Sequence, residues 1–342
     1  MPAAVCRMSE TLTSHAVTLS VTVDGVPVPG AERLELLQCG HFAADRFRVM
    51  LAMNAMQGGA AFYAALQTAT VTIGINLGTA AFPGGSADTI LIGRLDNVVM
   101  DFGAGQVVLS GRDLSARLID AEVQQTFSNR TASQIAWSFA SDAGLSENVT
   151  VTKTPVGQYY ELAHVRTGLG AHTRHMTRWD LLAALAEIER FSLSVTGTVL
   201  NFGPVPQAAP VLLNFGRDLV SLSVDRALGL IEPKVTVKSW NPKLKQAFSS
   251  SAGSTGGVTL VRPNLMQAEV DRLAASRQAE LAGQAVLARA TMPGEFLLRP
   301  DRPVFLQGTG TALDGKYIVR TVERFVDMRE GFIQRFEAVQ VV

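Results

Sequence analysis

Apolar and polar residues alternate with a period of two over much of the first third of the chain. Val17, Leu19, Val21 and Val23 alternate with serine and threonine, which predicts a half-buried strand, and Asp24-Gly25 then predicts a tight turn. Shorter runs of the same kind are separated by glycine-rich turns, at Arg46–Met53, Thr70–Ile75, Asp88–Asp96, Val98–Phe102 and Gln106–Ser110. Residues 1–110 are therefore predicted to form a first β-domain, a barrel or a strongly bent sandwich.

The apolar spacing then becomes helical. Thr131 begins the sequence TASQ, which predicts a capping box with Gln134, and Gly144-Leu145 ends this helix. Thr177 is the predicted cap of a further helix with two adjacent apolar stripes, one formed by Trp179, Leu182, Ala183 and Ala186 and the other by Leu181, Leu185 and Ile188. Alternation over residues 191–202, with a central glycine turn, adds a hairpin. Residues 111–204 are therefore predicted to form an α-rich middle domain.

A strand pattern returns after a proline-containing linker at 203–206. Strands are predicted at Val211–Phe215, Leu219–Asp225, Pro233–Trp240, Glu295–Arg299, Val304–Gln307, Lys316–Arg324 and Gly331–Val341. The sequence SSSAGSTGG at Ser249–Gly257 predicts a flexible loop, and the alanine-rich residues after it predict a long helix. Residues 205–342 are thus predicted to form a second β-barrel domain, interrupted by a loop at 246–262 and a helix at 264–290. The predicted fold class is α+β, with two antiparallel β-barrels flanking an α-rich domain.

Composition adds a low surface charge to this picture. Of the 342 residues, 47% are hydrophobic and 18% are charged, against about 25% charged in typical globular proteins. Thirty basic and thirty acidic residues give a net charge of zero, so no global field indicates nucleic acid. A surface poor in charge is typical of a protein that buries part of itself against a partner, and equally of one with a large core. The two cysteines, Cys6 and Cys39, favour a reducing compartment.

No catalytic motif is found in the sequence. His164, His172 and His175 fall within twelve residues, but no carboxylate or cysteine lies nearby, so a solvated loop is favoured over a metal site. Glu187 and Glu189 are two residues apart on a predicted helix, so they point to different faces and do not form an acid–base pair. We therefore predict no catalytic residue, no metal site and no cofactor.

The end of one predicted strand is the candidate protein interface. Trp240 and Asn241 precede a proline, and lysines lie along the same strand and turn, at Lys234, Lys238, Lys243 and Lys245. The candidate interface residues are Trp240, Asn241, Lys243 and Lys245, which would contact a neighbouring chain. The alternative is a solvated basic face with an aromatic residue at its rim.

Several segments together resemble a known family. GRDLSARLID, TASQIA, WDLLAALA and VTGTVLNFGP are similar to the late-control D type baseplate hub proteins of contractile-tailed bacteriophages. VTVKSWNPKLKQ is similar to a strand of that family and of the amino-terminal part of type VI secretion spike proteins, and LDGKYIVRTVERF looks like the family's last barrel. The resemblance spans residues 90–342, whereas the first 90 are similar only in style. It departs at Arg299-Pro300-Asp301, where a glycine-containing turn is commoner.

The resemblance implies a homotrimeric hub that contains two tube-like barrels in each chain. Three chains would then present six similar units, joining a threefold central spike to a sixfold tail tube and nucleating tube assembly. The implied partners are a further copy of the chain, the spike protein and the tail tube protein, with the tape-measure and baseplate wedge proteins as further candidates. The implied location is the virion tail, assembled in the host cytoplasm, with no membrane and with DNA only as passing cargo.

Two other functions stay open from the sequence. A tail must cross a cell envelope, so the chain is alternatively a cell-wall hydrolase carried at the tail tip. The second alternative is a glycan-binding adhesin, which predicts aromatic side chains exposed on sheets, although aromatic residues make up only 7% of the chain.

Overall fold

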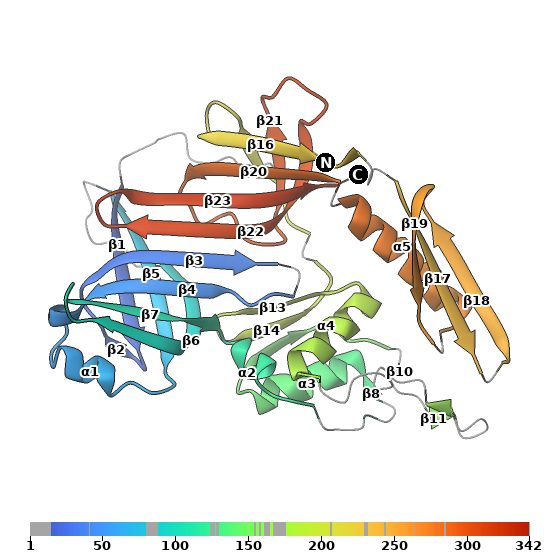
Figure 1. The fold of residues 1–342 in the computed structure, drawn as a ribbon, viewed down its shortest axis with the longest axis horizontal. Helices are drawn as coiled ribbons and strands as arrows, with labels where there is room; N and C mark the ends of the chain where they lie inside the picture. Colours follow the sequence, from blue (N-terminus) through green and yellow to red (C-terminus); the bar gives the residue numbers. More distant parts are fainter. Residues whose placement is uncertain are drawn as a thin grey trace.

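The computed structural model describes residues 15–40, 42–79, 88–123, 127, 130–153, 155–156, 159–160, 165–166, 176–205, 207–228, 232–242, 244–263, 265–283 and 285–341. A long curved sheet forms the body of the molecule, helices lie below one end of it, and a small sheet with one helix projects to the side (Figure 1). Most of the described chain is antiparallel β-sheet, and helices are few.

The large sheet has 13 strands, and eleven of them follow the order β16-β20-β23-β22-β3-β4-β7-β6-β5-β1-β2. We call its first part, which includes the short helices η1 (Met53–Ala55) and α1 (Ala60–Ala64), the first β unit. Its strands are β1 (His15–Val23), β2 (Val26–Pro27), β3 (Ala31–Cys39), β4 (Arg46–Ala52), β5 (Thr70–Thr79), β6 (Asp88–Asp101) and β7 (Gln106–Asp113). Alternate residues of these strands face one core, which contains Leu34, Val49, Ile73 and Leu109.

The remaining strands of the large sheet form the second β unit. They are β15 (Val211–Asn214), β16 (Ser221–Arg226), β20 (Val286–Pro293), β21 (Pro303–Gln307), β22 (Gly315–Asp327) and β23 (Gly331–Gln340). β21 pairs with β22 and also with β15, the latter in parallel. A separate core lies here, around Tyr317, Val319 and Phe336.

The two β units share one ladder. β3 of the first unit pairs with β22 of the second, from Thr321 opposite Cys39 to Asp327 opposite Arg33. Among the described strands, no hydrogen-bonded ladder links the two ends of the sheet. The units are therefore joined edge to edge, and the closure of either into a barrel stays a prediction.

One strand replaces two that the sequence predicts separately. β6 runs for 14 residues through both predicted segments, Asp88–Asp96 and Val98–Phe102. Its register with β7 shifts between Leu95 and Asn97, so the polar interruption is a bulge rather than a turn. Opposite Leu95 lies Gly111, where an added Cβ would come 1.9 Å from the carbonyl oxygen of Arg94.

The middle unit follows the predicted helices closely. α2 (Ala116–Ile119), α3 (Ala132–Asp142) and α4 (Arg178–Glu189) pack on a sheet of β13 (Ser192–Thr196), β14 (Val199–Gly203) and β9 (Ser146–Val149). Both predicted caps, Thr131 and Thr177, form capping boxes. Four two-residue strands form two further pairs: β8 (Arg130–Thr131) with β10 (Pro155–Val156), and β11 (Tyr159–Tyr160) with β12 (Val165–Arg166).

One position of the predicted apolar stripes on α4 is wrong. Ile188 is 51% exposed, although it shares a stripe with the buried Leu181 and Leu185. Ile188 lies in the last turn of the helix, past the part that Leu182 and Leu185 bury in the middle core. The buried face of α4 is therefore shorter than the stripe in the sequence.

We call residues 232–283 the inserted module, and its strands show that the predicted loop at 246–262 is wrong. β17 (Pro233–Asn241) lies between β18 (Gln246–Ala252) and β19 (Thr255–Val261), with only a short turn at Gly253 between the outer two. Serine and glycine usually indicate loops, but here a central strand supplies the apolar residues and its two neighbours need only backbone pairing. The predicted flexible loop is therefore two strands.

The helix and one strand after it also differ from the prediction. α5 is Gln267–Gly283, so the predicted helix at 264–290 is too long, and its last part belongs to β20. Alanines at 288 and 290 suit a helix, yet they face the second core from a strand. The predicted strand Glu295–Arg299 is a turn, because the Glu295 carboxylate accepts hydrogen bonds from the amides of Leu297 (3.0 Å) and Leu298 (2.8 Å).

No helix among the described residues has the length and apolar character that a membrane crossing requires.

Candidate functional sites

Two of the predicted interface residues, Trp240 and Asn241, lie on opposite faces of β17. Trp240 is 54% exposed on β17, whereas Asn241 beside it is 7% exposed and points to the helix side of the sheet. The Asn241 amide nitrogen donates to the sulfur of Met266 (3.4 Å), and its oxygen accepts from the amide of Leu244 (3.2 Å). Lys245 lies exposed in the following turn, and Lys243 lies outside the described residues. Asn241 therefore anchors the strand to the start of α5.

Alternation along β17 separates the two faces of the inserted module. One face packs on α5 through Val235, Val237, Val270 and Ala274. The opposite face, which we call the outer face, carries long cationic, aromatic and small hydroxyl side chains. Its residues are Lys234, Thr236, Lys238, Trp240, Ser249, Ser251, Thr259 and Val261. The sequence indicated the aromatic and the lysines, but only the register shows which of them face the same way.

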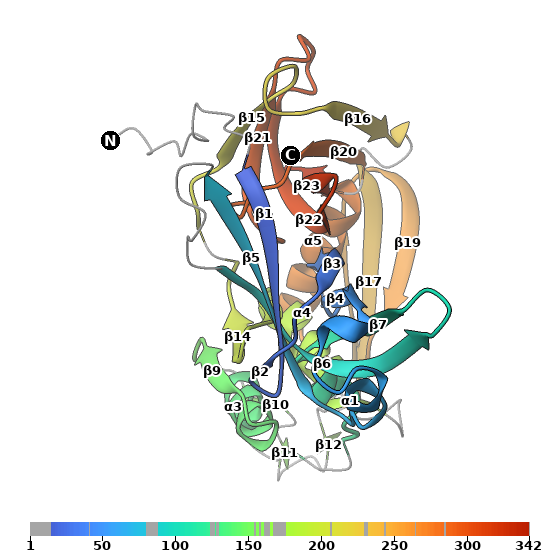
Figure 2. The ribbon, with the colours of Figure 1, turned by 90° about the vertical axis from the view of Figure 1, so that its left-hand side faces the viewer.

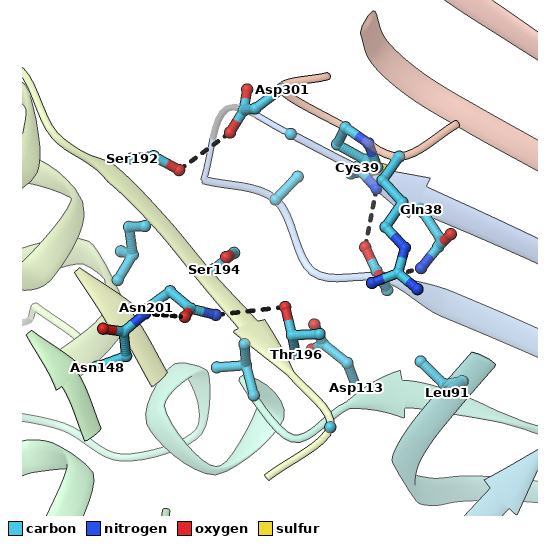
Figure 3. Close-up of a pocket in the computed structure, with 18 of the residues that line it drawn as sticks. Gln38, Cys39, Leu91, Asp113, Asn148, Ser192, Ser194, Thr196, Asn201 and Asp301 are labelled. Atoms are coloured by element: carbon cyan, nitrogen blue, oxygen red, sulfur yellow. Dashed lines mark hydrogen bonds between the residues drawn. The ribbon is translucent and has the colours of Figure 1, made fainter. Parts of the chain in front are cut away.

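A cavity of about 550 Å³, lined by both polar and apolar residues, lies where the middle unit meets both β units. Ser192, Ser194 and Thr196 of β13 form one wall, and Gln38 and Cys39 at the end of β3 stand opposite (Figure 3). The Ser192 hydroxyl donates to Asp301 at 3.0 Å, which ties β13 to the loop before β21. This volume lies in the range of about 300–1,000 Å³ that is typical of ligand sites.

Two carboxylates lie at this cavity with unusual ionisation. Burial raises the pKa of Asp45 to about 7, and the nearby charge of Asp113 adds to the rise. Burial likewise raises the pKa of Asp113 to about 6. Asp45 accepts from the amide of Cys39 (2.8 Å) and from Gln38 (3.2 Å), while Asp113 accepts from the amide (3.1 Å) and hydroxyl of Ser115. Both carboxylates therefore close local turns.

Arg324 of β22 is the buried cation at the same cavity. Its guanidinium donates to the carbonyl oxygen of Leu298 (2.5 Å), while its Nε and Nη1 have no hydrogen-bond partner among the described residues. Burial lowers the pKa of Arg324 to about 10, although the negative charge of Glu295 acts to raise that pKa. Gln334 lies opposite Arg324 on β23, and its Oε1 is also unpaired among the described residues. Sequence reasoning missed this pair of buried polar side chains. Arg324 and Gln334 each occupy a position between apolar residues on the buried face of their strands.

The cavity offers little for nucleophilic chemistry. Burial raises the pKa of the Cys39 thiol to about 11, with Asp45 as the second cause, so the thiol stays protonated and unreactive near neutral pH. Within the described part of the chain, no group of three or more His, Cys, Asp or Glu could hold a metal ion. His164, His172 and His175 lie outside the described residues.

Ion pairs hold the first β unit against the middle unit beside this cavity. Arg112 of β7 contacts Asp96 (2.7 Å) at the bulge of β6 and Asp120 (3.0 Å) after α2. Arg94 bonds the same two carboxylates. On the other side, the indole nitrogen of Trp179 donates to the carbonyl oxygen of Phe42 (2.6 Å). These contacts fix the orientation of the middle unit.

Comparison with solved structures shows which proteins share this fold. No protein-family model and no curated protein sequence matches the chain. A 43 kDa tail protein of prophage MuSo2 from Shewanella oneidensis superposes with a TM-score of 0.72 at 19% identity, over 95% of this chain and 98% of that one. A tail protein from Neisseria meningitidis MC58 superposes with a TM-score of 0.75 at 14% identity, over 95% and 97%. The chain has the fold of bacteriophage tail proteins.

The same fold extends to a secretion apparatus. An E. coli component of the type VI secretion system, which exhibits structural similarity to the T4 bacteriophage tail proteins gp27 and gp5, superposes with a TM-score of 0.60. The identity is 10%, and the match covers 94% of this chain and 77% of that one. The structural neighbours are thus phage tail proteins and proteins related to type VI secretion spikes, as the resemblance in the sequence predicts.

Proposed function

We propose that the chain is a structural hub of a phage tail baseplate. In this proposal three copies form a ring that joins the threefold central spike to the sixfold tail tube and nucleates the tube. The shared fold with phage tail proteins supports a structural role in a tail. The three-domain division at 1–110, 111–204 and 205–342 is part of the same proposal.

The ladder between β3 and β22 is the observation that carries the proposal. It places two β units side by side in one chain, with strands of both in a single curved sheet. A chain that carries two such units can present six of them as a trimer, because a contact between unlike surfaces closes a ring when its rotation is 120°. Closure of each unit into a tube-like barrel within that ring belongs to the proposal.

The partners and the location follow from this role. The spike protein and the tail tube protein would bind opposite ends of the ring, and the tape-measure and wedge proteins are further candidates. The protein would act in the virion tail after assembly in the host cytoplasm. The cavity is then a junction between domains rather than a catalytic centre, since backbone amides engage the carboxylates of Asp45 and Asp113, and the Ser192 hydroxyl engages that of Asp301.

Light scattering on the purified chain tests the proposal. The expected mass is three times the 36.5 kDa of one chain, either alone or after addition of the spike protein. A sample that stays monomeric at high concentration and binds neither spike nor tube protein would overturn it. A peptidoglycan release assay on the same sample addresses the alternative of a cell-wall hydrolase, for which the proposal expects no activity.

A further inference from the structure

The outer face of the inserted module has a single sign of charge. Lys234, Lys238 and Trp240 alternate along β17, and the serines and threonines of β18 and β19 flank them. Thr236 and Ser251 hydrogen-bond each other across the face at 2.8 Å. None of the residues that form this face is acidic, and neither lysine has an ion pair within the described chain.

The module turns this face away from its own body. α5 lies between the module's sheet and the rest of the molecule in Figure 1, and in Figure 2 the module lies behind the large sheet. Arg277 of α5 pairs with Glu187 of α4 at 2.8 Å, and Arg190 donates to the carbonyl oxygen of Arg272 at 3.0 Å. The helix side of the module therefore docks inward, and the outer face is open to another molecule.

The inserted module and the remainder of the chain have net charges of opposite sign. Residues 232–283 contain seven Lys and Arg against four Asp and Glu. Since the whole chain has 30 of each, the remainder carries 23 basic and 26 acidic residues and a net charge of −3. The module therefore has a net charge of +3 and the remainder one of −3, so the module of one copy and the remainder of a second copy attract each other.

A face of one charge sign also restricts the symmetry of the contact. A twofold contact between the outer faces of two copies would place Lys234 and Lys238 against each other, and like charges in contact are destabilising. A contact with a different, acidic surface of the next copy avoids this repulsion. Contacts between unlike surfaces generate rings, and a ring of three is one of their closed forms.

We propose that the outer face of the inserted module binds an acidic surface, outside residues 232–283, of the neighbouring copy of this chain. This inference rests on the homotrimer of the proposed function and assigns the surface that holds it together. Trp240 supplies the apolar anchor near the end of β17, and the lysines supply orientation and the attraction that speeds association. The residues that carry the contact are therefore Lys234, Lys238 and Trp240.

Charge reversal measured by sedimentation tests the surface. The double variant Lys234→Glu, Lys238→Glu should dissociate at least about tenfold more readily than the wild type, which should itself weaken as sodium chloride rises from about 50 to 500 mM. The matched control Lys153→Glu, Lys316→Glu changes two other exposed lysines and should associate as the wild type does. Thermal melting must show each variant folded, and Trp240→Ala replaces the double variant if that one does not fold.

The outcomes separate this inference from the proposed function. A trimeric wild type with a dissociated double variant and an intact control supports the inference. A double variant that stays as trimeric as the wild type overturns the inference and leaves the homotrimer standing. A wild type that is monomeric throughout overturns the homotrimer and the inference with it.

Photo-crosslinking identifies the occupant directly. A p-benzoylphenylalanine placed at position 240, in a mixture of ¹⁴N-labelled and ¹⁵N-labelled chains, reports whether a crosslink joins two copies. Crosslinks between unlike isotopes that end outside residues 232–283 support the inference. Crosslinks that end within 232–283 of the second copy, or that stay within one chain, overturn it.

Discussion

Asp45 and Asp113 are residues whose ionisation is coupled to folding, at the cavity where the middle unit meets both β units. Burial raises both pKa values, to about 7 and about 6, so each charged form is less favourable in the folded chain than in the unfolded one. The neutral form of Asp45 stabilises the fold fully below the ordinary aspartate pKa. That stability is lost as the pH rises through about 7.

Replacement of Asp45 tests this coupling. The wild-type free energy of unfolding should fall between pH 5 and pH 8, and Asp45→Asn should remove part of that fall, on the order of 2 kcal/mol because the wall of the cavity is open to solvent. Asp225→Asn, at an exposed position on β16, is the matched control and should leave the pH profile unchanged. Thermal melting at several pH values measures the effect, and an identical slope for Asp45→Asn and wild type would contradict the account.

Gly111 is a second residue that the fold constrains. A Cβ at this position would lie 1.9 Å from the carbonyl oxygen of Arg94, so Gly111→Ala must push β6 and β7 apart. We expect a loss of several kcal/mol in denaturant unfolding. Gly283→Ala has no atom within 4 Å of the new Cβ and should cost nothing measurable. Equal stabilities of the two variants would show that the bulge of β6 absorbs the added methyl group.

The packing of helices and strands in the middle unit depends on the buried face of α4. Leu182 is fully buried between the helices and the small sheet, so Leu182→Asp places an unpaired charge in the core and should cost several kcal/mol. Ile188→Asp makes the same change on the same helix at an exposed position and should cost under about 0.5 kcal/mol. Denaturant unfolding compares the two, and a wild-type midpoint for Leu182→Asp would contradict the packing.

The serine-rich strands of the inserted module make a different kind of prediction. β17 pairs on both sides, so its amides should exchange slowly with deuterated solvent, while β18 and β19 should protect only the amides that face β17. Hydrogen exchange read by NMR resolves this alternation. Uniformly fast exchange over residues 246–261 would instead support the flexible loop that composition indicates.

These elements show what the sequence could and could not predict. The capping boxes at Thr131 and Thr177 and the alternation of Val17 to Val23 were predictable, because each signal is local. The strands at 246–261 were not, since their apolar support comes from β17 and α5 rather than from their own residues. The cavity was not predictable either, because Arg324 meets Asp45 only through the pairing of β22 with β3.

At the scale of the whole molecule, the proposed trimeric assembly requires two β units in one chain. The β3–β22 ladder fixes their relative orientation, the ion pairs of Arg94 and Arg112 orient the middle unit, and the inserted module presents a basic face outward. An assembly built from such chains would carry twice as many β units as copies. That ratio is what the proposed role between a threefold spike and a sixfold tube requires.

Electron microscopy of the assembled chain viewed along its ring axis tests this claim most directly. We expect a ring of three chains in which six β units of similar shape surround the axis, with three inserted modules between neighbouring copies. A ring with only one β unit per chain around the axis, or an assembly without a threefold axis, would contradict it.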